Sequence, residues 1–182
     1  MVTFTDDVTA ALDATIDRLS PRGVVVVTDE NVSRHVMPLL DSVLGRYPVC
    51  VIPAGDENKT LDTAVHVWAF MSEHGVTRNS LVINVGGGMV TDLGGFCAAT
   101  FKRGVRFVNV ATTLLGAVDA AVGGKTGINF HELKNEIGLF READEVIIST
   151  LFFETLPREE LLSGYGEVIK HALLTSPDDG GR

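Results

Sequence analysis

The sequence predicts an α/β protein of the Rossmann-like type, in which a parallel sheet carries helices on both faces. Three observations predict this class. Short β-branched runs alternate with segments of helical periodicity over residues 8–110. The connections between them are short, which favours parallel strands joined by helical crossovers. Three glycines, Gly86 to Gly88, follow a strand pattern and precede a helix pattern, as at many anion-binding turns.

Local patterns place the individual elements. Apolar, often β-branched runs bounded by turn residues predict buried strands at 24–27, 49–52, 81–85, 107–110 and 146–148. Apolar residues at helical spacing predict helices at 8–19, 32–44, 61–74 and 93–101. Pro38 should bend or restart the second of these helices, because proline lacks the backbone donor.

The last third of the chain has a different character. Residues 122–140 are glycine-rich and predict loops or short strands. A helix should follow over about residues 156–174, with a restart near Ser163. We therefore expect a Rossmann-like domain over residues 1–156 and the first helix of a truncated helical second domain over residues 157–182.

The composition is that of an ordinary globular protein, with 45% hydrophobic and 21% charged residues. A net charge of -9 argues against a nucleic-acid surface, and no apolar run is long enough for a membrane span. The N-terminus lacks the basic and apolar regions of a signal peptide. Cys50 and Cys97 lie in apolar segments and indicate neither disulfides nor a zinc site. We expect a cytoplasmic protein without membrane or nucleic-acid partners.

One window departs from the acidic character of the whole chain. Residues 101–141 carry the basic side chains Lys102, Arg103, Arg106, Lys125, Lys134 and Arg141, against the acidic side chains Asp119, Glu132 and Glu136. A basic window in an acidic chain indicates a pocket for a small anion. Chance clustering on a solvated face explains the window equally well.

Polar residues and glycines follow each of the first four predicted strands, at the edge where ligands bind in such sheets. They are Asp29, Asn31, Asp56, Lys59, Gly87, Gly88, Asp92, Thr112 and Thr113. Asp29, Asn31 and Asp92 have an alternative role as helix caps, and the glycines could form only a tight turn. If these loops converge, they could form a dinucleotide site. A carboxylate at Asp29 would favour NAD over NADP, because it repels a 2′-phosphate.

Further polar residues stand at positions suited to a substrate. Lys125 follows two glycines and could hold a carboxylate or phosphate, while Asp119 could bind a hydroxyl. A surface ion pair between the two is the alternative. Glu167 and Lys170 share one face of the last helix. His171 has metal-ligand spacing from Glu167, but one such pair falls short of a site, and an exposed histidine is the commoner case.

In their order and spacing, these motifs resemble the 3-dehydroquinate synthase family. The stretches that carry the resemblance are Gly86-Gly87-Gly88 with Asp92, Arg103-Gly104-Val105-Arg106-Phe107, Thr112-Thr113-Leu114-Leu115, Val118-Asp119, Gly123-Gly124-Lys125-Thr126, Lys134-Asn135 and Glu167-Val168-Ile169-Lys170. The resemblance covers nearly the whole chain. Each motif is weak by itself, and the ordered set is specific.

The resemblance implies an NAD- and zinc-dependent (or cobalt-dependent) lyase of the shikimate pathway. Such an enzyme converts 3-deoxy-D-arabino-heptulosonate 7-phosphate to 3-dehydroquinate with loss of phosphate. The implied NAD contacts are Asp29, Asn31, Asp56, Lys59, Gly87, Gly88, Asp92, Thr112, Thr113, Lys125, Lys134 and Thr155. The implied substrate contacts are Asp119 to a hydroxyl, Lys125 to the carboxylate, Lys134 where NAD and substrate meet, and Asn135 and Lys170 to the phosphate. Glu167 would ligate zinc, and Arg103 would reach the phosphate of the other subunit in a homodimer.

Two departures from the family pattern limit the prediction. Ala120 and Ala121 stand where many relatives have serines. Family members also have a helical second half that supplies two histidine zinc ligands, which cannot be assigned here. We therefore expect an N-terminal portion, inactive by itself, whose residues 157–182 begin the metal- and substrate-binding domain. A non-catalytic NAD-binding module and a related sugar-phosphate cyclase remain alternatives, and the glycerol dehydrogenase group ranks below them.

Overall fold

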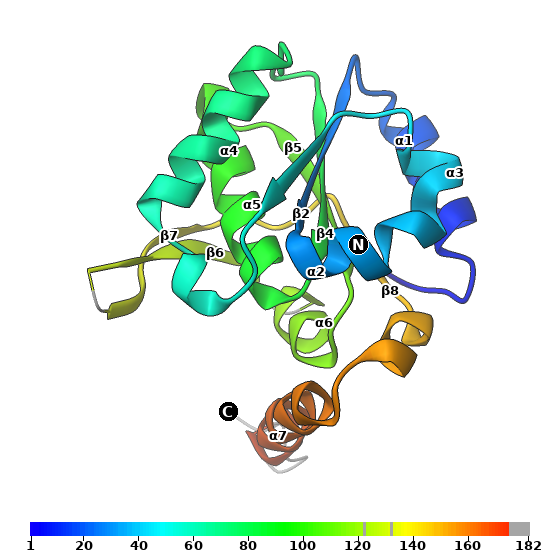
Figure 1. The fold of residues 1–182 in the computed structure, drawn as a ribbon, viewed down its shortest axis with the longest axis vertical. Helices are drawn as coiled ribbons and strands as arrows, with labels where there is room; N and C mark the ends of the chain where they lie inside the picture. Colours follow the sequence, from blue (N-terminus) through cyan, green and yellow to red (C-terminus); the bar gives the residue numbers. More distant parts are fainter. Residues whose placement is uncertain (122, 132, 175–182) are drawn as a thin grey trace, which may run out of the picture.

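The structure, a computed structural model, describes residues 1–121, 123–131 and 133–174. In these residues the chain forms a six-stranded sheet in the order β1-β8-β5-β4-β2-β3, in which every neighbouring pair is parallel (Figure 1). The strands are β1 (Val2–Phe4), β2 (Val24–Asp29), β3 (Val49–Ile52), β4 (Leu81–Gly86), β5 (Arg106–Ala111) and β8 (Glu145–Ile148). The predicted parallel α/β class is confirmed.

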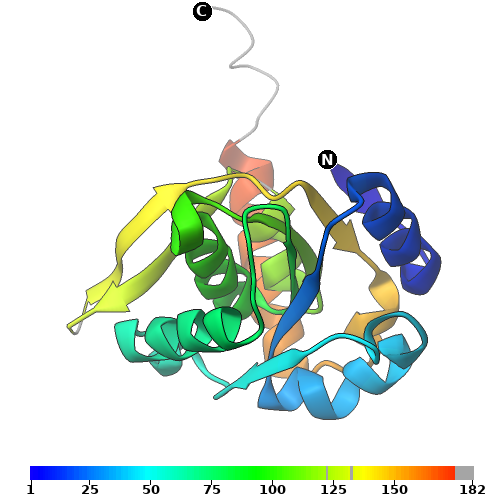
Figure 2. The same ribbon diagram turned by 90° about the horizontal axis from the view of Figure 1, so that it is seen from above.

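Helices cover both faces of the sheet. One face carries α1 (Val8–Leu19), α2 (Glu30–His35), the 3-10 turn η1 (Met37–Leu40) and α3 (Asp41–Leu44). The other carries α4 (Leu61–Glu73) and α5 (Gly88–Thr100), as Figures 1 and 2 show. Alternate residues of β2 face the two layers, because successive side chains of a strand point to opposite faces. This double burial explains the unbroken valine run that predicted the strand.

The strand order reverses between β2 and β4. From β2 the chain passes to β3 at one edge, then returns to β4 and continues in the other direction to β5 and β8. In doubly wound sheets such a reversal leaves a crevice beyond the carboxyl ends of the two central strands. The reversal here lies between the turn after Asp29 and the turn after Gly86, which both carry predicted ligand residues.

The structure corrects several predicted elements. The helix predicted at 93–101 begins at Gly88, because Gly86 ends β4, Gly87 caps the helix and no separate glycine loop stands between them. Two elements were not predicted, namely β1 and α6 (Leu114–Ala121). The helix after Pro157 is a single element, α7 (Arg158–Leu174), without the predicted restart near Ser163. The interruption expected at Pro38 is confirmed, since η1 separates α2 from α3 there.

A two-stranded antiparallel hairpin of β6 (Lys125–Phe130) and β7 (Leu133–Phe140) occupies most of the glycine-rich stretch. It stands out from the sheet beside α4 and α5 (Figure 2). Ile128 anchors it, because this side chain is fully buried in the core that α4 and α5 form with the sheet. The outer strand β7 is exposed over nearly its whole length. No helix among the described residues is long and apolar enough to cross a membrane.

Candidate functional site

The turn between β4 and α5 leaves room for a ligand. Gly87 caps α5 without any side-chain hydrogen bond, so the first amides of the helix keep their capacity to donate. A Cβ on Gly87 would lie 2.9 Å from Thr113 Cγ2, whereas a Cβ on Gly88 would meet nothing within 4 Å. The protein itself therefore requires a glycine at position 87 but not at 88. A glycine that faces open space at a helix N-terminus is typical of backbone approached by an anionic ligand.

Asp29, on the other side of the crevice, has the structural role that the sequence left open. Its Oδ1 accepts hydrogen bonds from the amides of Asn31 and Val32, at 2.8 and 2.9 Å, and so caps α2. The carboxylate is thereby held at the carboxyl end of β2, nearly buried. A side chain fixed in this way is pre-oriented for a ligand, and capping does not exclude ligand binding.

The two threonines after β5 differ in their hydrogen bonds. Thr113 Oγ1 accepts from the amide of Gly116 at 3.0 Å and starts α6. Thr112 is only 2% exposed, and its hydroxyl has no hydrogen-bond partner among the described residues. A buried hydroxyl without a partner costs about 1–3 kcal/mol, so this group is well suited to bond a ligand.

A buried lysine lies at the centre of the site. Lys59 Nζ donates to Asp92 Oδ2 at 3.1 Å and to Asn135 Oδ1 at 2.7 Å, and lies 3.5 Å from Asp56 Oδ1. Its side chain is only 5% exposed. A buried ammonium group is tolerable when carboxylates and an amide oxygen take up its protons. This contact joins the turn after β3, the helix α5 and the hairpin, none of which adjoin in sequence.

The hairpin residues Lys134 and Asn135 lie where β6 and β7 lose their regular pairing. Ile128 pairs with Ile137 and Phe130 with Leu133, so three residues of β7 face one residue of β6. Lys134 Nζ reaches Asp56 Oδ2 at 2.7 Å. The hydrogen bond to Lys134 lowers the pKa of Asp56, and the same bond raises the pKa of Lys134.

Asp92 lies on the second turn of α5, so the suggestion that it caps the helix is wrong. Burial raises the pKa of its carboxyl group, and the charges of Asp119 and Asp56 act in the same direction, while Lys59 opposes them. The carboxyl group of Asp92 thus lies near the charges of Asp56, from the turn after β3, and of Asp119, from α6.

Helices α6 and α7 bring the last motif to this edge. A Cβ on Gly164 would lie 2.7 Å from Leu114 Cβ, so the helices cross closely at this glycine. Beyond the crossing, Lys170 Nζ donates to Glu167 Oε1 at 2.8 Å. This bond raises the pKa of Lys170, and the charge of Asp119 on α6 contributes in the same direction. The predicted pair of Glu167 and Lys170 thus lies within electrostatic reach of Asp119.

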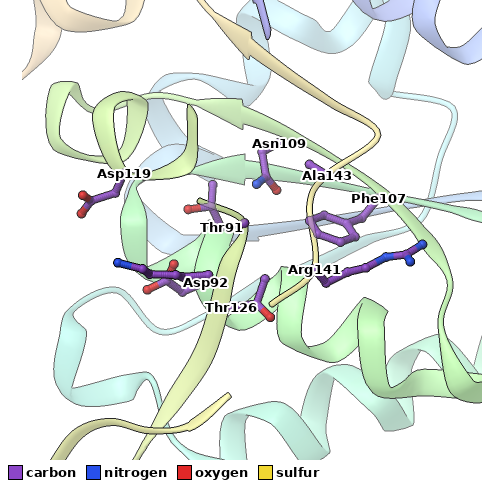
Figure 3. A pocket seen from close by; sticks show the side chains of 10 residues that line it. Thr91, Asp92, Phe107, Asn109, Asp119, Thr126, Arg141 and Ala143 are labelled. Carbon is purple, nitrogen blue, oxygen red and sulfur yellow. The ribbon is translucent and has the colours of Figure 1, made fainter. Parts of the chain in front are cut away.

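A small cavity lies between α5, β5 and the hairpin. Its volume, measured as the space open to the centre of a water molecule, is ≈ 10 Å³. Figure 3 shows Asp92 and Asp119 toward one end and Phe107 and Arg141 toward the other. Lys125 also lines it. The lining residues that the sequence did not single out are Thr91, Asn109 and Ala143. Four more had no assigned role, although Phe107, Gly124 and Thr126 stand in the motifs of the resemblance and Arg141 stands in the basic window.

The basic window divides into two groups. Lys125, Lys134 and Arg141 lie at the site, whereas Lys102, Arg103 and Arg106 lie at the opposite end of α5 and the start of β5. From Asp92 to the end of α5 at Thr100 the helix rises roughly 12 Å at 1.5 Å per residue, and Arg103 lies beyond that end. Arg103 is exposed and has a left-handed backbone, with φ of 67°. The structure therefore does not bring Arg103 to the site of its own chain.

The predicted metal site is incomplete in the described residues. No group of three histidine, cysteine, aspartate or glutamate side chains stands there in a position to hold a metal ion. Glu167 is 20% exposed at its side chain and paired with Lys170. The side chains of His171 and Thr155 lie outside the described residues.

The fold and the site together define a doubly wound α/β protein whose charged residues gather at the carboxyl edge of the sheet, beside a glycine turn at the strand-order reversal. Residues 49–163 match the family described as 3-dehydroquinate synthase N-terminal. The chain belongs to the 3-dehydroquinate synthase family.

Named relatives agree with this assignment. The chain is 43% identical over 180 residues to a 3-dehydroquinate synthase of Parabacteroides distasonis, and the aligned region covers 98% of this chain and 51% of the relative. It is 44% identical over 167 residues to that of Pyrococcus abyssi, covering 91% and 50%. Among solved structures it resembles a 2-epi-5-epi-valiolone synthase of Streptomyces hygroscopicus with NAD+ and Zn2+ bound, at a TM-score of 0.85 and 30% identity. The match covers 93% of this chain and 48% of the synthase. The chain spans about half the length of these relatives.

Proposed function

We propose that this chain is the nucleotide-binding portion of a 3-dehydroquinate synthase, a lyase that converts 3-deoxy-D-arabino-heptulosonate 7-phosphate to 3-dehydroquinate and phosphate. The observation that carries the proposal is the contact of Lys59 with both Asp92 and Asn135. It joins the turn that would bind the nucleotide to the hairpin that would bind the substrate. A simple nucleotide-binding domain has no need for such a link.

The residues present fit NAD. The uncapped N-terminus of α5 and the open space at Gly88 suit the pyrophosphate, and the Thr112 hydroxyl can bond the nucleotide. Asp29 would accept from ribose hydroxyls with the oxygen that capping leaves available. Bound NAD would supply transient oxidation of a substrate hydroxyl, which makes loss of the phosphate possible and is reversed afterwards.

The substrate would lie between the cavity and the hairpin. Asp119 would accept from a substrate hydroxyl, and Lys125 would hold the carboxylate as a point charge. Asn135 and Lys170 would bind the phosphate, which must be held and its charge offset as it leaves. Lys134 would stand where the nucleotide and substrate meet. The supporting observation is that Asp119 and Lys170 lie within electrostatic reach of each other, although they come from different helices.

A zinc site does not fit the described residues alone. Glu167 is the proposed ligand, and a catalytic zinc site needs three protein ligands and an open position. We therefore derive no step through a metal, and we expect the 182 residues by themselves to lack turnover. In this proposal residues 1–156 form the nucleotide-binding domain, and residues 157–182 begin the domain that completes the metal and substrate site.

Two variants of Asp29 test the nucleotide assignment. Asparagine caps helices as well as aspartate, so Asp29→Asn should keep α2 intact while it removes the charge. Calorimetric titration should show that the unsubstituted chain binds NAD more tightly than NADP, and that Asp29→Asn narrows the difference. Tighter binding of NADP by the unsubstituted chain would contradict the assignment.

Release of phosphate from the heptulosonate substrate, with NAD and zinc, tests the reaction. We expect no turnover by the purified chain, and restored turnover when a separately expressed second half of a relative is added. Glu167→Gln should then abolish it. Turnover of about 1 per second or more by the chain alone, which is usual for enzymes, would show that its own residues complete the site.

Two alternatives are distinguished by the same experiments. A non-catalytic NAD-binding module would bind NAD but stay inactive with every added second half. A related sugar-phosphate cyclase would turn over a different sugar phosphate, as the 30% identity to a valiolone synthase allows. The higher identity to relatives named 3-dehydroquinate synthase favours the first proposal.

The proposed assembly is a homodimer in the cytoplasm. Arg103 supports it, because this exposed residue lies a helix length from the site of its own chain and would have to act on another. Sedimentation equilibrium at micromolar concentration measures the state. A strict monomer would leave Arg103 without this role.

A further inference from the structure

Asn129 occupies a position in the hairpin that none of the assigned roles uses. It is the one residue of β6 that stands between the pairs Ile128 with Ile137 and Phe130 with Leu133. The residues of β7 that face it are 134–136, and these include the proposed substrate residues. A residue opposite an irregularity of this kind has no regular ladder partner, so its bonding groups are available for other segments.

Its side-chain amide and its backbone amide join separate segments. Asn129 Nδ2 donates to the backbone oxygen of Asp56 at 2.9 Å, and its Oδ1 accepts from the backbone amide of Asn135 at 3.0 Å. Its own backbone amide donates to the Lys59 oxygen at 2.7 Å. The side-chain orientation is unambiguous, because exchanging the amide nitrogen and oxygen would break both side-chain bonds.

The bond from Asn129 fixes an amide in left-handed backbone. Asn135 has φ of 57°, in the region where asparagine is one of the few residues other than glycine that is enriched. With its amide fixed by Asn129, Asn135 directs Oδ1 to Lys59 Nζ at 2.7 Å. The neighbouring Lys134 reaches Asp56. The hydrogen bonds of Asn129 to backbone atoms join the turn after β3 to the hairpin. The side-chain bonds of Lys59 and Lys134 join the same two segments.

We propose that Asn129 is a positioning residue that fastens the substrate-facing irregularity of β7 to the nucleotide-facing turn after β3, so that a nucleotide bound at the turn also orders Lys134 and Asn135. The inference rests on the proposed function for the identity of the two ligands. The fastening itself rests only on the contacts of Asn129. Because the two segments lie on different elements, binding at one affects the other through the contacts between them. Asn129 supplies three of these contacts, beside those of Lys59 and Lys134.

Two substitutions separate the two side-chain bonds. Asn129→Asp keeps the acceptor for Asn135 but lacks the donor and places a carboxylate against the Asp56 oxygen. Asn129→Ala removes both bonds. Asn79→Asp is the matched control, since Asn79 is an exposed asparagine just before β4, at the opposite edge of the sheet. The amide of residue 135 donates to the Asn129 side chain, so its exchange, measured by NMR with and without NAD, reports directly on that bond. The amide of residue 129 donates to the Lys59 oxygen, so its exchange reports on whether the two segments stay together.

Without NAD, Asn129→Ala should speed exchange at both amides by about 2- to 10-fold, the range given by one hydrogen bond. Asn129→Asp should speed exchange at position 129 and leave position 135 protected. Amides of β2 and β4 should be unchanged in both, which distinguishes loss of fastening from unfolding. Unchanged exchange at position 129 in Asn129→Asp, or at position 135 in Asn129→Ala, would overturn the proposal.

With NAD, the unsubstituted chain and Asn79→Asp should show slower exchange over residues 133–138. Asn129→Asp should bind NAD about 2- to 10-fold more weakly and, when saturated, should show a smaller slowing, because Lys59 and Lys134 still join the two segments. Equal slowing in the saturated Asn129→Asp chain would overturn the proposal. Failure of the unsubstituted chain to bind NAD would refute the proposed cofactor. The measurements without NAD would then still test whether Asn129 connects β7 to the turn after β3.

Discussion

Replacing Thr112 by valine should stabilise the protein and weaken its ligand. Thr112 is 2% exposed, and its hydroxyl has no hydrogen-bond partner among the described residues. Burying a hydroxyl without a partner costs about 1–3 kcal/mol. Valine has nearly the same shape without the polar atom, so Thr112→Val should recover that amount. For a chain of this size the gain corresponds to a rise in melting temperature of roughly 2–12 °C.

Thr28→Val is the matched control, because Thr28 is fully buried and donates to the Val85 oxygen at 2.9 Å. The same chemical change should there lower the melting temperature by a similar amount, since it leaves a buried carbonyl without its donor. The two variants should therefore shift stability in opposite directions in thermal unfolding without ligand.

The ligand arm decides the role of Thr112. If its hydroxyl bonds NAD, calorimetry should show weaker binding by Thr112→Val, by about 2- to 10-fold for one hydrogen bond. The rise in melting temperature that NAD produces should shrink accordingly. A Thr112→Val variant that is less stable without ligand, or that binds NAD with unchanged affinity, would refute the reasoning.

Three further predictions concern stability, the glycine turn and the thiols. Burial raises the pKa of Glu145, but hydrogen bonds from threonine and arginine side chains outweigh burial and lower it. The ionised carboxylate should therefore stabilise the fold above pH of about 4.5, and this stabilisation should be lost as the pH falls below that value. Glu145→Gln should be less stable than the unsubstituted chain at pH 7 and, in an acid titration, should lose less stability as the pH falls. Gly88→Ala should fold normally and bind NAD at least about 10-fold more weakly. Gly116→Ala should instead lower the melting temperature, because its Cβ would lie 2.8 Å from the Gly88 amide nitrogen. If calorimetry gives Gly88→Ala the same NAD affinity as the unsubstituted chain, the role of the glycine turn is contradicted. Burial raises the pKa of Cys50 to about 11 and raises that of Cys97 further. Neither thiol should therefore react with a thiol reagent at pH 7 until the chain is unfolded in denaturant. Rapid reaction of the folded chain would show that the core around these cysteines opens to solvent.

Local patterns in the sequence predicted the sheet because the burial of a strand determines which residue types it contains. A strand covered on both faces must be apolar at every position, and the valines at 24–27 meet this requirement without reference to any other element. β1 was missed because it has only three residues, two of them exposed, and its register comes entirely from pairing with β8. α6 was missed because it has only eight residues, of which Asp119 is the one polar residue, so no alternation of polar and apolar faces marks it.

The sequence alone also determined which residue types gather beyond the strands, since each strand ends where its polar or glycine residues begin. Only the tertiary structure decided which of them meet. Lys59 contacts Asp92 and Asn135 across 33 and 76 residues, and Asn129 contacts Asp56 across 73. Periodicity reports whether a position is buried but carries no information on its partner. The partner is set by the strand order and by the irregular register of one hairpin, both of which result from packing of the whole chain.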